Sequence, residues 1–385
     1  MSASKTILVL GGGVGGLATA VTLRKKLPAI HRIILVEREK HHLFQPSLLW
    51  IMTGTRRPEQ IVRSLDRLTR KGIEVIRGTV ESIDPERRQA TISGATHSCD
   101  FMVIALGAEL APESIPGLPE SGHSFYSLEG AQLLHEALRG FKSGRLVVLT
   151  AAPAYKCPAA PYEAVMLLES DLRKRKVREQ VKVDLYAAEP GPMGVAGPTV
   201  SAAVRGLVEA KGITYHPEHQ ITSVDPQLKK LHFANGVEAE FDLLAYVAPH
   251  RPPKVVRDSG LVNEAGWIPV DRSTLQTRFE GVFAIGDITT IPLKLGKPLP
   301  KAGAFAHGQA EVVANNIACV ITGKGHPITF AGHGDCFVEI GDGRAAMGAG
   351  NFYGDPTPQI QLRAPGRYWH LGKVLFEKWW LWRWF

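Results

Sequence analysis

The sequence predicts an α/β protein with two Rossmann-like, dinucleotide-binding-type domains in tandem, each built in three layers, and a further C-terminal region. Short apolar runs bounded by Gly and Pro recur along the chain, and such runs are typical of buried parallel strands. A glycine-rich turn follows the first run, Thr6–Leu10, and leads into a helical stretch. A second alternation of strand, loop and helix begins at Arg145, which indicates that the same kind of unit occurs twice.

The first unit begins with the strand Thr6–Leu10, the turn at residues 11–16 and a helix that extends to Leu27. Leu43–Gly54 contains a proline, which cannot continue a helix, so we expect no regular helix there. Residues 112–122 are rich in Pro and Gly and mark a boundary. The other strands expected in this unit are 33–36, 74–83, 89–92 and 101–106.

The second unit begins with a strand at 146–150, a loop at 151–161 and a helix at 162–174. A strand at 181–187 and a helix at 198–211 continue the alternation. The remaining elements are β structure at 212–215, 221–224, 228–233 and 243–247, a linker at 249–254, a strand at 282–285 and a helix at 308–321.

The composition is that of an ordinary globular protein, with 44% hydrophobic and 21% charged residues among 385. It excludes disordered and collagen-like proteins, and 4 Cys are too few for a disulfide scaffold. The net charge of +8 favours acidic partners, but no zinc-finger spacing or RNA-binding signature accompanies it, so neither nucleic acid nor a metal site is expected. No secretory signal is visible, and no apolar run reaches the roughly 20 residues of a membrane-spanning helix.

The strongest motif is Gly11-x-Gly13-x-x-Gly16, which lies between a strand and a helix, with Glu37 at the end of the next strand. Gly11 permits a tight turn, Gly13 lets a pyrophosphate approach the backbone, and Gly16 lets the helix pack on the sheet. The helix N-terminus offers N–H groups to phosphate, and Glu37 can accept hydrogen bonds from ribose hydroxyls. Further cofactor-binding candidates around this motif are Gly15, Arg38 and Val80.

Two other segments indicate which dinucleotide is bound. Residues 281–287 place Gly286 and Asp287 at the end of an apolar strand, which resembles the second flavin motif of flavoproteins with two dinucleotide-binding domains. Ala105 and Gly107 end another strand and resemble the short motif between these two in the same superfamily. Three motifs in this order imply FAD in the first unit.

We therefore expect three domains. Residues 1–115 and 255–325 form a discontinuous FAD-binding domain, and residues 116–254 form the second Rossmann-like domain. The C-terminal region is residues 326–385.

The second unit lacks the glycine-rich loop that would bind NAD(P)H. Its loop at 151–161 has no glycine and three prolines, which remove N–H groups and prevent close approach of a pyrophosphate. The loop contains Cys157 instead, directly after Lys156 and just before a predicted helix. A cation and a helix N-terminus both favour a thiolate, so we expect Cys157 to be reactive.

At this point the chain resembles the sulfide:quinone oxidoreductases, and more distantly flavocytochrome c sulfide dehydrogenase and type II NADH dehydrogenase. Residues 156–161, Lys-Cys-Pro-Ala-Ala-Pro, are similar to the family's Lys-Cys-x-x-Ala-Pro loop. Residues 334–337, Gly-Asp-Cys-Phe, are similar to its C-terminal active-site cysteine. Residues 300–303, Pro-Lys-Ala-Gly, and 44–47, Phe-Gln-Pro-Ser, are similar to its Pro-Lys-x-Gly and early x-Pro-Ser segments.

The resemblance implies that Cys157 and Cys336 form a redox pair, with thiol pKa values lowered so that a thiolate is present near neutral pH. Hydrosulfide would be oxidised to polysulfide or sulfur at this pair, and two electrons would pass through FAD to a membrane quinone. Lys301 and Gly303 would lie near the flavin, where Lys301 acts electrostatically, and Glu163 is a candidate proton acceptor. Cys99 and Cys319 have no counterpart, and we expect them to be packing residues.

The sequence also departs from the family pattern. Ser127 stands where many members have a third cysteine, and Met193 stands where a family histidine lies. Proton management and the substrate can therefore differ from those of well-known members. Alternatives that stay open are a type II NADH:quinone oxidoreductase, a flavocytochrome-type sulfide dehydrogenase and a flavin redox sensor without turnover. The sequence also leaves a homo-oligomer open.

The C-terminal tail, Arg367–Phe385, carries five of the 7 Trp and has apolar residues at helical spacing with charges between them. It is too short and too charged to span a bilayer, but it suits a helix in the membrane interface. We therefore expect a peripheral, monotopic protein on the cytoplasmic face of the inner membrane. The alternative is a tail that packs on its own domain or on a partner. The residues of the expected apolar face are Tyr368, Leu371, Leu375, Trp379 and Trp382.

Overall fold

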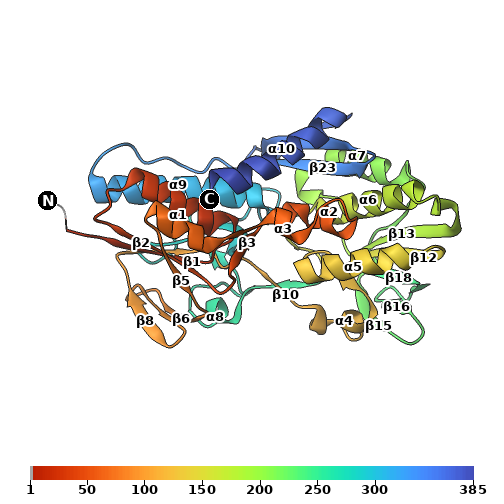
Figure 1. Cartoon of the computed structure of the whole chain (residues 1–385), viewed down its shortest axis with the longest axis horizontal. Helices are drawn as coiled ribbons and strands as arrows, with labels where there is room; N and C mark the ends of the chain where they lie inside the picture. The colour runs from red at the N-terminus through yellow and green to blue at the C-terminus, as the bar shows by residue number, and fades with distance from the viewer. Residues whose placement is uncertain (1–2) are drawn as a thin grey trace.

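The structure, a computed structural model, describes residues 3–385. Two parallel sheets of five strands lie side by side along the long axis of the molecule (Figure 1). In spatial order, the first sheet contains β21 (Val282–Ala284), β9 (Phe101–Ile104), β1 (Thr6–Leu10), β2 (Arg32–Glu37) and β5 (Glu74–Arg77). The second contains β11 (His123–Ser124), β18 (Leu243–Val247), β12 (Gly144–Thr150), β13 (Val181–Ala187) and β14 (Thr214–His216).

Each parallel sheet is the middle layer of three, with helices on one face and an antiparallel three-stranded meander on the other. The alternation of side chains along β1 shows this directly, since Ile7 and Val9 join the core under the helices while Leu8 and Leu10 join the core under the meander. The first unit has helices α1 (Val14–Lys26) and α9 (Gly303–Thr322) and strands β6 (Val80–Asp84), β7 (Gln89–Ile92) and β8 (Ala95–Ser98). The second has α5 (Leu128–Gly140), α6 (Ala160–Lys174), α7 (Pro198–Glu209), β15 (Ile221–Asp225), β16 (Lys230–Phe233) and β17 (Glu238–Glu240).

Short elements connect and cover these layers. The strands β10 (Glu109–Leu110) and β19 (His250–Arg251) pair where the chain crosses between the two units. The domain boundaries expected at 115/116 and 254/255 stay a prediction. The other short elements are β3 (His41–Leu43), β4 (Val62–Ser64), β20 (Ile268–Pro269), β22 (Thr289–Thr290), α2 (Leu48–Met52), α3 (Pro58–Ile61), α4 (Leu118–Ser121), α8 (Lys254–Arg257) and the 3-10 helices η1 (Gln45–Ser47), η2 (Leu65–Lys71), η3 (Pro112–Ser114), η4 (Arg178–Gln180), η5 (Gly194–Ala196) and η6 (Gly286–Ile288).

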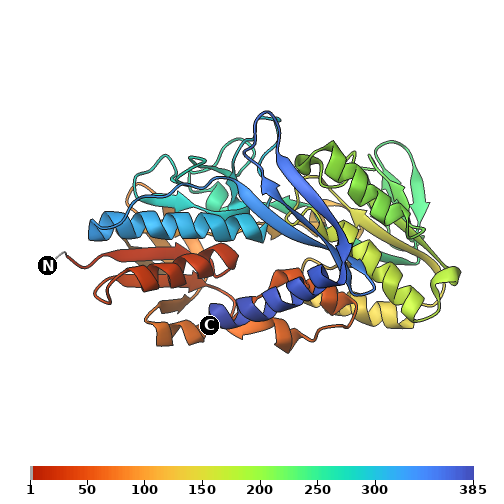
Figure 2. The ribbon, with the colours of Figure 1, turned by 90° about the horizontal axis from the view of Figure 1, so that it is seen from above.

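The C-terminal region forms an antiparallel sheet and a long final helix. The sheet contains β23 (His333–Gly341), β24 (Arg344–Asn351) and β25 (Gln359–Gly366). The helix α10 (Arg367–Arg383) runs from this sheet, beside the second unit, to the helices of the first unit, as both ribbon views show (Figures 1 and 2). None of the helices within residues 3–385 is long and apolar enough to cross a bilayer.

The predicted α/β class with two Rossmann-like units is confirmed, and so are most of the predicted strands. The expected strand at 74–83 is two strands, β5 and β6, which lie in different sheets because the chain turns at Gly78. The segment 43–54 is not free of helix, since the five-residue helix α2 begins after the proline. The helix α5 and the sheet β23–β25 have no counterpart among the expected elements.

Candidate active site

The glycine-rich turn between β1 and α1 shows the close contacts that require its first and third glycines. Gly11 has φ +105°, and a Cβ atom there would lie 2.4 Å from the carbonyl oxygen of Ala105. A Cβ atom on Gly16 would lie 1.8 Å from the carbonyl oxygen of Gly11. Both contacts are with backbone, which cannot move aside, so only glycine fits at these two positions.

Gly13 is different, because no atom of the described chain lies within 4 Å of the place where its Cβ would stand. It is the N-cap of α1 and provides no side-chain cap, so the N–H groups of the first turn keep their capacity to bind an anion. Glu37, at the end of β2, accepts a hydrogen bond of 2.7 Å from the N–H of Gly12. An open glycine cradle at a helix N-terminus beside a carboxylate fits a dinucleotide.

The turn at Gly286 and Asp287 lies at the same edge of the sheet as this cradle, because β1 and β21 both run parallel to β9 and end level with Ile104. Gly286 has φ +75°, and its N–H donates to the side-chain oxygen of Gln309 on α9 at 2.7 Å. Within residues 3–385, no group donates a hydrogen bond to the carboxylate of Asp287. Burial raises the pKa of Asp287, while Lys156 and Lys301 oppose the shift. A half-buried acceptor of this kind fits a cofactor that donates hydroxyl groups, as the ribityl chain of FAD does.

The other cofactor-binding candidates lie in varied places. Gly15 packs under Ile285, whose Cδ1 atom would be 3.0 Å from an added Cβ. Gly107 has φ +69° and open space around it, which suits the approach of a ligand. Gly303 begins α9, Arg38 is exposed beside Glu39, and Val80 is buried at the start of β6. Their roles toward the cofactor stay predictions.

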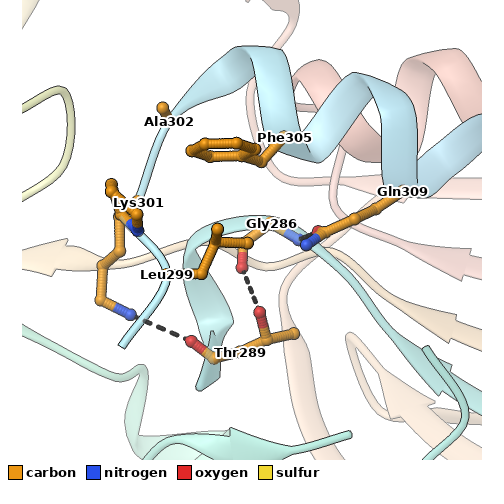
Figure 3. Close-up of a pocket in the computed structure, with 8 residues that line it drawn as sticks. Gly286, Thr289, Leu299, Lys301, Ala302, Phe305 and Gln309 are labelled. Carbon is orange, nitrogen blue, oxygen red and sulfur yellow. Dashed lines mark hydrogen bonds between the residues drawn. The ribbon is translucent and has the colours of Figure 1, made fainter. Parts of the chain in front are cut away.

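Lys301, in the segment just before α9, makes hydrogen bonds with the turn that follows β21. Its Nζ atom donates to the carbonyl oxygens of Asp287 at 2.6 Å and of Thr289 at 3.2 Å (Figure 3 draws the second bond). The ammonium group lies 3.4 Å from the centre of the Trp267 ring, in a cation–π contact. Burial lowers the pKa of Lys301 to about 8, against the attraction of Asp287. Lys301 lines a small hollow with Phe305 of α9, which Figure 3 shows.

The two predicted redox cysteines lie side by side although they are 179 positions apart in the chain. Cys157 is in the loop before α6 and Cys336 is on β23, and the two side chains are close enough to interact. The thiol of Cys336 donates a hydrogen bond to the carbonyl oxygen of Phe337 at 3.2 Å. Cys157 has φ +50°, and its N–H donates to the carbonyl oxygen of Lys301 at 2.6 Å. The hydroxyl of Tyr126 donates to the carbonyl oxygen of Cys157 at 3.1 Å. The left-handed backbone is thus held by contacts on both sides.

The expectation that both thiol pKa values are lowered is wrong for Cys336. The neighbouring Cys157 thiol raises the pKa of Cys336, and burial and the carboxylate of Glu163 act in the same direction. Lys373 opposes them without reversing the shift. In the reduced pair Cys336 therefore keeps its proton to a higher pH than an ordinary thiol does. The other two cysteines do not join them: Cys99 donates to the carbonyl oxygen of Arg88 and Cys319 lies on α9.

Glu163 is buried in α6 and is already engaged. Its carboxylate accepts hydrogen bonds of 2.9 Å from the Nζ of Lys373 on α10 and from the N–H of Glu339 on β23. Burial raises the pKa of Glu163 against the opposing effect of Lys373. Burial also disfavours the charged form of Lys373, but Glu163 and Glu339 outweigh it and raise its pKa. Glu339 in turn contacts the ring of His370 at 3.0 Å.

The loop of the second unit is closed by its own side chains. Glu189, just after β13, accepts hydrogen bonds from Thr150 at 2.8 Å, from Tyr162 at 2.7 Å and from Tyr155. An acid at this place in a Rossmann unit usually serves a ribose hydroxyl. Here the carboxylate is occupied by protein donors, which agrees with the absence of a glycine-rich loop at 151–161.

The two departures from the family pattern have local roles. Ser127 is the N-cap of α5, and its hydroxyl accepts a hydrogen bond from the N–H of Gly130 at 3.1 Å. Met193 adopts φ +49° before a short 3-10 helix and packs against the core.

Sequence reasoning missed three residues of this site: Lys373, Tyr126 and His250. Lys373 was expected only as a charge that interrupts the apolar tail. Tyr126 and His250 carry no motif, because a tyrosine before a serine and a histidine in a linker occur in many sequences.

The helix α10 has charged residues on its inner face as well as apolar ones. Glu377 pairs with Arg56 at 2.9 Å and accepts from Ser47, and it is 3% exposed. Trp380 donates from its ring nitrogen to His42 at 3.1 Å, and His42 bonds the carbonyl oxygen of Gly12 at 3.0 Å. The five apolar residues of the expected outer face, Tyr368, Leu371, Leu375, Trp379 and Trp382, are all exposed.

Comparisons with known proteins agree with this geometry. Residues 5–310 match the family described as pyridine nucleotide-disulphide oxidoreductase. Sulfide-quinone reductase of Aquifex aeolicus (strain VF5) is 29% identical over 402 aligned positions, which cover 99% of this chain and 91% of that protein. The mitochondrial sulfide:quinone oxidoreductase of Mus musculus is 26% identical, covering 91% of this chain and 79% of that protein. A solved structure of sulfide:quinone oxidoreductase from the hyperthermophilic bacterium Aquifex aeolicus superposes with a TM-score of 0.90 at 27% identity, covering 99% of this chain and 91% of that one.

Proposed function

The chain belongs to the pyridine nucleotide-disulphide oxidoreductase family, and we propose that it oxidises sulfide at Cys157 and Cys336 and transfers the electrons through FAD to a quinone. The observation that carries this proposal is the contact between the two cysteines, beside the turn at Asp287 that fits the cofactor. The similarity to sulfide:quinone oxidoreductases over nearly the whole chain supports it.

The reaction at the cysteine pair needs no group other than sulfide and an electron acceptor. In the oxidised pair, hydrosulfide attacks one sulfur of the Cys157–Cys336 disulfide, an S–S bond forms and the bridging S–S bond breaks. The products are a persulfide on one cysteine and a thiolate on the other. A second hydrosulfide attacks the outer sulfur and leaves with it as HSS⁻, the shortest polysulfide, so the pair is left as one thiol and one thiolate. Oxidation of this pair re-forms the disulfide and releases a proton and two electrons, for which FAD, when bound, would be the acceptor that passes them to a quinone.

The protein contributes position and charge. The bond from Cys157 N–H to Lys301 ties the reactive loop to the turn that begins at Gly286. Lys156 makes no hydrogen bond or ion pair with any group of residues 3–385. Burial lowers its pKa, while Asp287 and Cys157 favour its charged form. Glu163 lies close enough to Cys336 to raise its pKa, so it is the candidate acceptor for the proton of that thiol.

The NADH-dependent alternative is disfavoured by Glu189, since three protein hydroxyls occupy the carboxylate that a nicotinamide nucleotide would use. A cytochrome-linked dehydrogenase and a redox sensor would share the cysteine pair, so they differ from the proposal in the electron acceptor and in turnover. Reoxidation of the reduced protein by a soluble quinone is expected for the proposal and for neither of these two.

We also propose that the outer face of α10 binds a membrane surface on the cytoplasmic side, where a quinone is reached. Trp382 is 76% exposed and Leu375 is 56% exposed, although large apolar side chains are normally covered. The test is sedimentation with vesicles that contain an anionic phospholipid. We expect Leu375→Ser with Trp382→Ser to lose most of the binding, whereas Val320→Ser, which removes an exposed apolar side chain from α9, keeps it. Unchanged binding by the α10 double variant would contradict the proposal.

The central test is anaerobic titration of the purified protein with sulfide and, in parallel, with NADH. We expect sulfide to bleach the flavin absorbance and NADH to leave it unchanged. Cys157→Ala and Cys336→Ala should each abolish the bleaching, while Cys99→Ala and Cys319→Ala, which lie elsewhere, should retain it. Bleaching at the wild-type rate in either of the first two variants would show that the pair is not catalytic.

A further inference from the structure

His250 lies at the crossing between the two units and has a free ring nitrogen. It is on β19, which pairs with β10 in the register Leu110 with His250. Its Nδ1 atom is 2.9 Å from the carbonyl oxygen of Ala248. A carbonyl only accepts hydrogen bonds, so Nδ1 carries the proton and Nε2 carries a lone pair. This Nε2 atom is buried and has no hydrogen-bond partner within residues 3–385.

The surroundings of His250 are those of the cysteine site. Its ring packs edge-on against Tyr126, with 5.6 Å between the ring centres, and the hydroxyl of Tyr126 bonds the backbone of Cys157. Lys156 and Lys301 approach from two other elements, the loop after β12 and the segment before α9. Burial lowers the pKa of His250 to about 3, and both lysines add to the shift. His250 is therefore neutral at physiological pH.

A neutral acceptor that two lysines approach matches the chemistry of one substrate class. Hydrosulfide is an anion with a single S–H donor, so it can be attracted by the lysines and donate its S–H to a ring nitrogen. A halide would gain from the charge but has no proton to donate. We propose that Nε2 of His250 accepts the S–H hydrogen bond of hydrosulfide and so orients its sulfur lone pairs toward the cysteine pair.

This inference rests on the proposed function and adds a positioning residue to it. No proton is transferred to His250. When the hydrosulfide sulfur bonds to a cysteine sulfur, its hydrogen stays on it as the S–H of the persulfide, and the displaced cysteine leaves as a thiolate. The same acceptor can therefore hold the substrate and the product of the step.

The experiment measures flavin bleaching by sulfide in stopped flow, with full-length protein loaded with FAD. His250→Phe keeps an aromatic ring against Tyr126 but removes the lone pair. We expect the sulfide concentration for half-maximal bleaching to rise about tenfold, as the loss of one hydrogen bond implies, with little change in the limiting rate. His250→Gln, which restores an acceptor oxygen, should recover most of the loss. His97→Phe, on the remote meander strand β8, serves as the control.

Three results would overturn the inference. A half-saturating sulfide concentration in His250→Phe equal to that of wild type would show that the ring nitrogen does not bind the substrate. Loss of FAD, or a shifted flavin spectrum with unchanged sulfide saturation, would assign the nitrogen to the cofactor. If sulfide does not bleach the wild-type flavin at all, the proposed function is wrong and the role of His250 falls with it.

Discussion

The ion pair between Lys373 and Glu163 joins the last helix to the cysteine site, and its removal has a calculable cost. Both side chains are almost fully buried, at 5% and 2% exposure. Lys373→Met leaves the Glu163 carboxylate in the interior with only the N–H of Glu339 as a donor. Removal of one partner of a buried pair costs about 3–5 kcal/mol, because the remaining charge is neither paired nor hydrated.

That cost can be converted into a change of melting temperature. An unfolding entropy of about 2.1 cal/mol/K per residue gives roughly 0.8 kcal/mol/K for this chain, so the Tm should fall by about 4–6 °C. Burial already raises the pKa of Glu163, and loss of Lys373 raises it further. A raised carboxyl pKa means that the folded state binds a proton more readily than the unfolded state. The deficit should therefore shrink as the pH falls through the raised value.

The assay is thermal unfolding followed by circular dichroism between pH 5 and 8. Lys378→Met is the matched control, because Lys378 lies on the same helix but is exposed, and it should change the Tm by less than about 1 °C. Adding Glu163→Gln to Lys373→Met removes the unpaired charge and should restore part of the stability. Equal Tm values for Lys373→Met and Lys378→Met, or a deficit that does not change with pH, would refute the reasoning.

Three further predictions concern separate elements. Gly13→Ala should leave the Tm of the FAD-free protein unchanged, since its Cβ meets no atom within 4 Å. The same variant should weaken FAD binding at least tenfold in a fluorescence titration. Gly206→Ala on α7 is the control and should leave FAD binding unaffected. The kcat/KM for sulfide should fall as the pH rises through about 8, where Lys301 loses its charge, and Lys301→Arg should move that fall to higher pH. The contribution of Lys301 to stability changes in the opposite direction. Between pH about 8 and 10.5 the unfolded chain binds more protons than the folded protein, so this contribution rises with pH. Ser127→Ala should cost about 1 kcal/mol by loss of the N-cap of α5, measured by urea unfolding, without any change in sulfide-dependent bleaching.

The parts of this protein that could be predicted are those where backbone geometry restricts the residue type. A Cβ atom on Gly11 or Gly16 would collide with a backbone oxygen, so the turn requires glycine at these two positions and the sequence pattern reveals the turn. The parallel strands are recognisable because both of their faces are buried. The helix α5 was missed because its buried residues, such as Leu134, are few and the rest of the helix is polar. Strands β23 and β25 carry charged and glycine residues that hide the alternation.

The site was predictable only in part, because its remaining groups are defined by distant partners. Nothing near Lys373 in the sequence shows that Glu163, 210 positions away, neutralises it. His250 likewise has meaning only after Tyr126 and the two lysines have been placed around it. Residues whose role comes from the chain's own local geometry leave a motif, and residues whose role comes from tertiary neighbours do not.

The helix α10 buries charged as well as apolar residues and exposes large apolar ones, and this has a physical consequence. Lys373 and Glu377 lie in the interior with counter-charges, while Leu375, Trp379 and Trp382 face outward. In water, exposure of a large apolar side chain costs roughly 1.5–3 kcal/mol relative to burial, so this arrangement is energetically unfavourable for a protein surrounded by solvent. It becomes favourable when the outer face enters an apolar medium and the inner charges remain paired within the protein. The helix that meets the membrane in our proposal also reaches Gly12 through His42 and Cys336 through Glu163, so it connects the surface where a quinone is found to both ends of the redox site.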